Sequence, residues 1–318
     1  MAAPPSTPAL TRGMAELLDN IRRANRPPFH TMRPVDARRA YEAASEILEL
    51  PRAPLVRVED IAIPADDGTP LQARLYAKSR ELRPVLLYLH GGGFTIGNLE
   101  SHDSLCRQLA LRSGAAVVAL DYRLAPEQCF PVAVDDAWAA MRWLAAHGAT
   151  LGLDGARLAV GGDSAGGTLA AVCAIHARDI GLALRLQVLI TPGTAPSTDT
   201  PSHARFAHGY LLEAEAIAWF FDQYIDRAQR RDWRFAPLEA GTLDAVAPAC
   251  VVLAECDPLV DEGLAYADRL RAAGVPVELE LARGVTHDFI KLGRALPEAG
   301  AAHALIGAAL QAAFDGGP

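Results

Sequence analysis

Short apolar runs alternate with helical patterns over most of the chain, and they predict the strands of one sheet. The runs lack polar alternation, which is typical of strands that are buried on both faces of a mostly parallel sheet. We expect these strands at residues 85–89, 116–120, 158–160, 186–190, 251–254 and 277–281. Helices are expected between them at 102–113, 132–147, 165–179, 261–273 and 298–314. The prediction is an α/β fold with a doubly wound sheet.

The first 50 residues predict two helices that precede the sheet. Apolar residues recur at helical spacing between Leu10 and Ile21, and Pro27 and Pro28 end that helix. A second helix is expected over residues 34–50, because proline suits the first helical position. This segment is therefore expected to be helical and separate from the alternating pattern that follows.

Two further features flank the sheet region. Residues 56–63 and 71–76 show near-alternating polarity on either side of an Asp-Asp-Gly turn, which predicts an antiparallel hairpin. The alternation of strands and helices is interrupted at residues 191–248. There a loop rich in Thr, Pro and Ser precedes an aromatic helix around residues 219–224. The sheet is thus expected to carry helical pieces before it and within it.

Composition and charge exclude several classes of protein. The chain has 318 residues, of which 51% are hydrophobic and 21% charged, a balance that disordered chains do not show. Its formal net charge is −8, from 38 acidic against 30 basic residues, whereas nucleic-acid-binding domains usually carry the opposite bias. We therefore expect no nucleic-acid partner.

The sequence shows no sign of secretion or membrane insertion. Residues 1–10 lack the basic start and apolar stretch of a signal peptide, and the longest apolar runs are far shorter than a membrane span. The five cysteines are scattered without C-x-x-C or histidine-pair spacing, so we expect buried free thiols rather than disulfides or a zinc site. These observations predict a cytoplasmic protein with no membrane span and no metal.

The strongest chemical signal is the segment GDSAGG at residues 162–167, which directly follows a predicted strand and opens a helix. Glycines two before and two after Ser164 remove the side chains that would collide in a tight strand-to-helix turn. Such a turn exposes the serine hydroxyl at the start of a helix, where negative charge is stabilised. The alternative is a glycine-rich turn that only tightens the junction, and the strand–turn–helix context favours a nucleophile.

A second signal is the segment HGGGF at residues 90–94, which follows the predicted strand 85–89. Consecutive glycines leave backbone N–H groups free to point into a cleft, and a tetrahedral oxyanion needs such donors. A phosphate-binding loop would require G-K-[ST], which is absent. We expect the oxyanion hole to consist of the N–H groups of Gly92, Gly93 and Ala165, with Gly91 a less suitable donor.

The segments HGGG, YRLAPE (residues 122–127) and GDSAGG together resemble the hormone-sensitive-lipase-like family of α/β-hydrolase carboxylesterases. The resemblance extends to residues 97–103 and to D-P-L at 257–259, and covers most of the chain from about residue 55. It implies a mostly parallel eight-stranded sheet with helices on both faces and no metal or organic cofactor. It also implies a catalytic domain at 51–318, with a helical cap formed by residues 1–50 and about 195–235. A homodimer through an edge strand is compatible with this family.

A nucleophilic serine needs a base, and the base needs a carboxylate to orient it. His287 follows the last predicted strand, which is where this fold places its base, and the order Ser, Asp, His along the chain fits. Asp257 follows strand 251–254 at the carboxyl edge of the sheet and matches the D-P-L pattern. The competing acidic residues are Glu255, Asp261 and Asp288.

The remaining residues of these motifs receive structural roles. His90 and residues 122–127 are expected to brace the oxyanion loop, and hydrogen bonds to neighbouring loops are expected to hold Asp163. Helix surfaces are the expected place of His102, His147, His176 and His303. The chain departs from the family at residues 128–129, at Cys256 where an aromatic residue is common, and at Asp288 where glycine is common. These departures concern the shape of the pocket.

The implied activity is that of a serine carboxylesterase acting on short- to medium-chain acyl esters. Ser164 would attack the ester, His287 would take its proton, and Asp257 would hold the imidazole. Two alternatives share the fold, a non-catalytic small-molecule receptor and a dehydratase of the same family. The receptor usually lacks the base, and the dehydratase typically carries threonine at the nucleophile position. Candidate residues of the substrate pocket are Phe29, His30, Phe206, Tyr210, Leu211 and Trp219.

Overall fold

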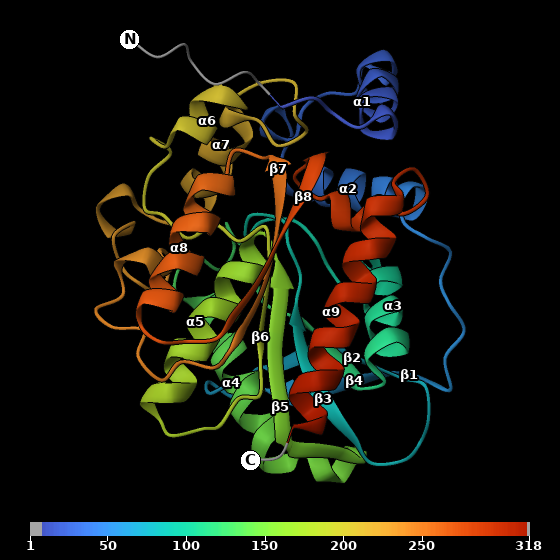
Figure 1. The fold of residues 1–318 in the computed structure, drawn as a ribbon, viewed down its shortest axis with the longest axis vertical. Helices are drawn as coiled ribbons and strands as arrows, with labels where there is room; N and C mark the ends of the chain where they lie inside the picture. The colour runs from blue at the N-terminus through green and yellow to red at the C-terminus, as the bar shows by residue number, and fades with distance from the viewer. Residues whose placement is uncertain (1–7, 317–318) are drawn as a thin grey trace.

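One sheet runs through the centre of the computed structural model, which describes residues 8–316 (Figure 1). Its eight strands, counted within these residues, follow the order β1-β2-β4-β3-β5-β6-β7-β8. The hairpin β1 (Arg57–Pro64) and β2 (Pro70–Ala77) is antiparallel, β2 pairs antiparallel with β4, and all later neighbours pair in parallel. The other strands are β3 (Arg83–Leu89), β4 (Ala116–Asp121), β5 (Leu153–Asp163), β6 (Gln187–Ile190), β7 (Ala249–Cys256) and β8 (Val277–Thr286). The expected mostly parallel, eight-stranded sheet is confirmed.

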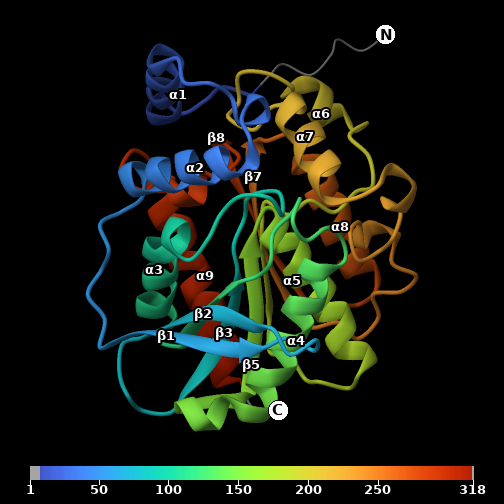
Figure 2. The ribbon, with the colours of Figure 1, turned by 180° about the vertical axis from the view of Figure 1, so that it is seen from behind.

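Helices cover both faces of this sheet (Figures 1 and 2). One face packs against α3 (Asp103–Ser113) and α9 (Pro297–Asp315). The opposite face packs against α4 (Val132–His147), α5 (Ala165–Asp179) and α8 (Val260–Ala272). The neighbours Leu86 and Leu87 of β3 are both fully buried and belong to opposite cores. This two-sided burial is why the strand sequences lack polar alternation.

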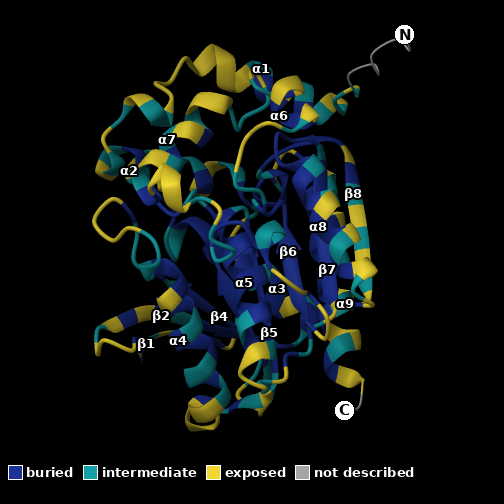
Figure 3. Ribbon diagram, turned by 90° about the vertical axis from the view of Figure 1, so that its left-hand side faces the viewer, coloured by how far each residue is buried: buried dark blue, intermediate teal, exposed yellow. Residues whose placement is uncertain are grey.

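Burial falls off toward the edges of the sheet, as Figure 3 shows for β8. The first residues of β8 alternate between partly buried and exposed, because successive side chains point to opposite faces and one face of this edge strand is open to solvent there. At the centre, α5 is buried along nearly its whole length. Its glycines and alanines let the helix backbone approach the sheet closely, which fixes the position of its first turn.

Four helices gather at the end of the sheet toward which β5 runs (Figures 1 and 2). They are α1 (Arg12–Ala24), α2 (Pro34–Leu48), α6 (Pro201–Arg205) and α7 (Ala214–Tyr224). The Thr11 side chain caps α1 by accepting from the Met14 N–H, and the Thr11 N–H donates to Gly284 of β8 at 2.8 Å. Short 3₁₀ turns are η1 (Phe29–Thr31), η2 (Glu100–His102), η3 (Gly148–Leu151), η4 (Arg227–Gln229), η5 (Pro237–Glu239) and η6 (Phe289–Lys291).

Two expectations about single residues away from the candidate site are wrong. His303 is buried rather than on a helix surface, because its ring nitrogen pairs with the Ile290 carbonyl at 2.8 Å on the inner side of α9. Cys129 is exposed, whereas the other four cysteines are buried, and all five are unpaired.

Two further expectations concern membranes and secretion. Among the helices of residues 8–316, none combines the length and apolar character needed to cross a bilayer. The expectation about a signal peptide concerns Met1–Leu10, and most of these residues lie outside the described part of the chain.

Candidate active site

The candidate nucleophile, Ser164, lies in the tight turn between β5 and α5. Its backbone has φ 53° and ψ −122°, a strained conformation, and its N–H donates to the Ile190 carbonyl at 2.8 Å. A Cβ on Gly166 would lie 1.9 Å from the carbonyl oxygen of Leu89, and one on Gly162 would lie 2.3 Å from the same atom. Because β3, β5 and α5 meet so closely here, both positions require glycine.

The imidazole of His287 reaches the serine from the end of β8. Its Nε2 lies 2.9 Å from Ser164 Oγ, and its Nδ1 lies 2.7 Å from Asp257 Oδ2. The side chains of His287 and Asp257 are almost fully buried, at 4% and 1% exposure. These distances are within hydrogen-bonding range, so three residues far apart in the sequence form one connected chain.

Of the four acidic residues considered from the sequence, Asp257 is the one bonded to Nδ1 of His287. Its other oxygen accepts the N–H of Leu259 at 2.9 Å, which fixes the carboxylate. Glu255 instead binds Arg283 and the Gly284 N–H, and Asp261 accepts the N–H of Ser202. The fourth, Asp288, lies 3.8 Å from the opposite ring nitrogen, Nε2.

The protonation of His287 predicts how activity depends on pH. Burial disfavours the charged imidazole, but the charge and hydrogen bond of Asp257 outweigh it and raise the pKa of His287 to about 9. A protonated imidazole cannot accept the serine proton, so activity is lost as the pH falls through this pKa. We expect kcat/KM for a neutral ester, measured from about pH 6 to pH 10, to keep rising toward pH 9. A plateau that is already reached near pH 7 would contradict this assignment.

The candidate oxyanion loop presents free donors beside the serine. Gly92 and Gly93 have positive φ angles of 121° and 57°, and a Cβ on Gly93 would lie 2.3 Å from the ring of Phe220. Among the described residues, no backbone or side-chain acceptor takes the N–H of Gly92, Gly93 or Ala165. The Gly91 N–H is already bonded to Asp163 Oδ1 at 3.1 Å, so it is not available.

A buried carboxylate beneath the loop holds it in place. Asp163 accepts hydrogen bonds from the Tyr88 hydroxyl at 2.6 Å and from the Gly91 N–H, and its second oxygen lies 3.2 Å from His102 Nε2. Burial opposes the charge of Asp163, but the partners, His102 foremost, hold its pKa well below the usual range. His102 is therefore buried against Asp163, and the expectation of a helix-surface position is wrong.

Two further sets of contacts brace the loop. His90 stacks on Tyr122 at a centroid distance of 4.3 Å, and burial lowers the pKa of His90 to about 3, so the ring is neutral. Arg38 of α2 donates to the Thr95 carbonyl at 2.8 Å and to the Ala125 carbonyl at 2.7 Å, and it pairs with Glu127. Arg38 could not be identified from the sequence. Its neighbours in the chain give no sign of the contacts with Thr95 and Ala125, which lie 57 and 87 residues further on.

A cavity with about 200 Å³ of open space connects these groups, and both Ser164 and His287 line it. Of the candidate pocket residues, Phe29 and Leu211 line the cavity, whereas His30, Phe206, Tyr210 and Trp219 do not. Phe206 is buried in the core against Tyr210, and Trp219 packs against Phe220 beside the cavity. Lining residues that the sequence did not reveal include Tyr41, Ile96, Ile217, Phe221 and Lys291.

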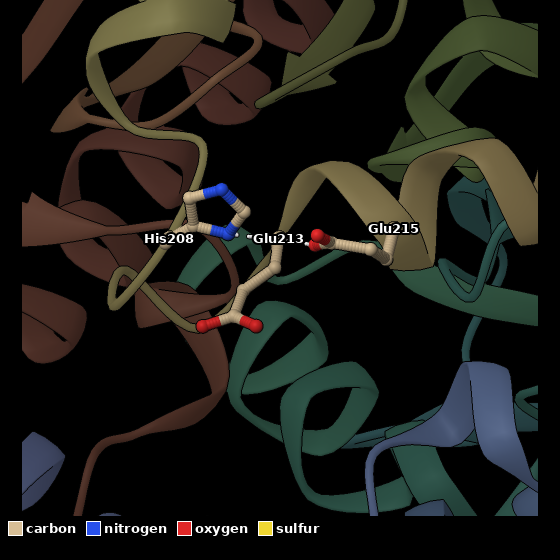
Figure 4. A group of neighbouring side chains, drawn as sticks. All are labelled: His208, Glu213 and Glu215. Atoms are coloured by element: carbon tan, nitrogen blue, oxygen red, sulfur yellow. Dashed lines mark ion pairs between the residues drawn. The ribbon is translucent and has the colours of Figure 1, made fainter.

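One group of possible metal ligands lies within the described residues, in the segment between α6 and α7 and the first turn of α7 (Figure 4). It consists of His208, Glu213 and Glu215, and His208 Nδ1 lies 3.5 Å from Glu215 Oε2. Glu213 already accepts the Gly209 N–H at 2.8 Å. None of the three lines the cavity that contains Ser164.

Comparison with known proteins places this geometry in a family. The α/β-hydrolase fold family matches residues 86–291. The chain is 43% identical to ethyl acetate hydrolase of Pseudomonas putida over 291 residues, which are 89% of this chain and 92% of that one. It is 42% identical to esterase LipI of Mycobacterium tuberculosis over 261 residues, 79% of this chain and 81% of that protein.

Solved structures agree with these sequence matches. An ester hydrolase from the metagenome of Lake Arreo superposes with a TM-score of 0.93 at 38% identity, covering 96% of this chain and all of the other. A hyperthermophilic esterase of the archaeon Pyrobaculum calidifontis gives a TM-score of 0.90 at 39% identity, covering 96% and 98% of the two chains. The chain therefore belongs to the α/β-hydrolase fold family and, within it, to the hormone-sensitive-lipase-like carboxylic ester hydrolases.

Proposed function

We propose that this protein is a serine carboxylesterase that hydrolyses short- to medium-chain acyl esters through an acyl-enzyme intermediate. The observation that carries the proposal is the hydrogen-bonded chain from Ser164 Oγ through His287 to Asp257, with distances of 2.9 and 2.7 Å. Such a chain transfers a proton away from the serine as its oxygen attacks a carbonyl carbon. A receptor of this fold would not need these three side chains in contact.

The proposed reaction has two halves. In the first, Ser164 Oγ attacks the ester carbonyl, His287 Nε2 takes the hydroxyl proton, and the proton then passes to the departing alcohol. The N–H groups of Gly92, Gly93 and Ala165, which have no acceptor among the described residues, would bind the negative oxygen of the tetrahedral intermediate. In the second half, water attacks the acyl-enzyme and the same proton transfers release a carboxylic acid.

The cavity supports a small, mainly apolar ester as the substrate. Its open space of about 200 Å³ is modest, and most of its lining side chains are apolar. The N-terminal helix α2 and helix α7 both contribute lining residues, which supports a cap formed by residues 1–50 and about 195–235. One relative is named ethyl acetate hydrolase, which is consistent with the short end of the proposed range.

The proposal includes a cytoplasmic location. All five cysteines are unpaired, which suits a reducing compartment where thiols stay free.

A serine-directed organophosphate tests the proposed chemistry. We expect stoichiometric labelling to abolish the hydrolysis of p-nitrophenyl acetate, and peptide mass spectrometry to locate the label on Ser164. Pre-incubation with a competing short-chain ester should slow the labelling, because both reagents need the same cavity. Full esterase activity of the labelled protein, or a label on another residue, would contradict the proposal.

A further inference from the structure

Asp288, the residue after the candidate base, has an unusual conformation and an unusual place. Its backbone has φ 62° and ψ 5°, in the left-handed region that favours glycine and that aspartate tolerates better than most residues. Its side chain is 25% exposed and lines the cavity that contains Ser164. A carboxylate is therefore held beside the reacting groups at a position where glycine would fit without strain.

Contacts from helix α2 orient this carboxylate. The Tyr41 hydroxyl donates to Asp288 Oδ2 at 3.5 Å. The buried Lys291 ammonium donates to the oxygen of that same hydroxyl and to Ser45 Oγ, both at 2.9 Å, so the tyrosine is itself fixed. With Oδ2 turned toward Tyr41, the other oxygen, Oδ1, faces His287 Nε2 at 3.8 Å.

The gap between Oδ1 and Nε2 fits one bound oxygen atom. A separation of 3.8 Å is too long for a direct hydrogen bond, and no described residue donates to Oδ1. An oxygen placed roughly 2.8 Å from both atoms would form an angle of about 85° between them, not far below the angle between the two O–H bonds of water. Nε2 is also the nitrogen that contacts Ser164, so this oxygen would lie next to the acyl group.

We propose that Asp288 positions the water that hydrolyses the acyl-enzyme, by accepting a hydrogen bond from its second O–H. The inference rests on the proposed acyl-enzyme mechanism. The water oxygen forms the new bond to the acyl carbon, one of its protons passes to His287 Nε2, and the bond from that carbon to Ser164 Oγ then breaks. The proton on Nε2 returns to Ser164 Oγ, and the second water proton leaves with the carboxylic acid. Asp288 holds that second proton in a hydrogen bond without taking it.

This arrangement selects water over alcohols as the acceptor of the acyl group. An alcohol has only one O–H, and this group must donate to His287. The alkyl group of the alcohol would then face the carboxylate of Asp288 and remove water from that charge. Water alone satisfies both groups at once. Asp288 thus favours hydrolysis over transfer of the acyl group to an alcohol.

The test is the ratio of two products formed from one acyl-enzyme. p-Nitrophenyl acetate is turned over in the presence of methanol, and acetate and methyl acetate are quantified for the wild type, Asp288→Gly, Asp288→Asn and the control Asn25→Gly. Both acceptors give their proton to the same nitrogen, so a change in the basicity of His287 largely cancels from the ratio. Asn25 is an exposed residue at φ 46° that does not line the cavity, and its replacement relieves the same left-handed backbone conformation.

We expect Asp288→Gly to shift the ratio toward methyl acetate by about tenfold, the effect of losing one hydrogen bond to a charged acceptor. Asp288→Asn keeps an acceptor oxygen and should give an intermediate shift, whereas Asn25→Gly should match the wild type. An unchanged ratio in Asp288→Gly, or an equal shift in Asn25→Gly, would overturn the role of Asp288. Intact-mass detection of the acetylated wild-type chain separates this failure from failure of the acyl-enzyme mechanism itself. Glycine suits the left-handed backbone, so the variant is expected to fold.

Discussion

Replacing Ser164 by alanine is expected to lower kcat/KM for p-nitrophenyl acetate by about 10⁵-fold or more, because the nucleophile is removed and His287 has no proton to accept. The fold should be unaffected. Alanine keeps the Cβ at the strained backbone position, and among the described residues the lost hydroxyl is hydrogen-bonded to His287 alone. Initial rates and the absence of a p-nitrophenol burst are the measurements.

The matched control for this variant is Ser79→Ala. Ser79 accepts a hydrogen bond from Arg83 between β2 and β3, well outside the cavity. Its esterase activity and thermal unfolding should match those of the wild type. Retention of even one-hundredth of the activity by Ser164→Ala, in protein free of wild-type contamination, would show that another group starts the reaction.

The second large effect is expected for Asp257→Asn, which should lower kcat by about 10⁴-fold with little change in KM. The asparagine amide would donate to His287 Nδ1 and force the ring proton onto Nε2, the atom that must accept from Ser164. The protein should still bind ester, so the loss appears in kcat. Steady-state kinetics with the acetate ester over a range of pH measures it.

Asp261→Asn distinguishes this mechanism from a general loss of negative charge. Asp261 lies four residues further on and accepts the N–H of Ser202 rather than contacting the imidazole. Its kcat should stay within a few-fold of the wild-type value. A loss in Asp261→Asn as deep as that in Asp257→Asn would show that the assignment of the orienting carboxylate is wrong.

Residues whose roles are local could be predicted from the sequence. The turn around Ser164 depends on Gly162 and Gly166, each two positions from the serine, so its geometry follows from a short segment. The strands are recognisable because burial on both faces imposes solid apolar runs. The partners of Ser164 could be proposed because a parallel sheet brings its carboxyl ends to one edge, which limits where a base and an acid can lie.

Residues whose roles depend on distant packing could not be predicted. His102 follows a short polar segment that looks like a helix surface, and only the position of Asp163 explains why it is buried. Lys291 carries a charge that sequence rules place in solvent, yet it is buried because Tyr41 and Ser45 of α2 surround it. Four of the six pocket candidates do not line the cavity for a related reason. Apolar residues of the cap serve the core and the cavity equally well, and sequence patterns do not separate the two uses.

The contacts of α1 and α2 with the last part of the chain also determine when the enzyme becomes complete during its synthesis. Thr11 bonds to Gly284, and Tyr41 to Lys291, which is translated 250 residues later. At roughly 5–20 residues per second, the ribosome needs about 10–50 s to make that intervening stretch. Helices α1 and α2 are therefore made well before their partners Gly284 and Lys291. His287 lies in that same late stretch, so the translation of one short segment both anchors these helices and supplies the proposed base.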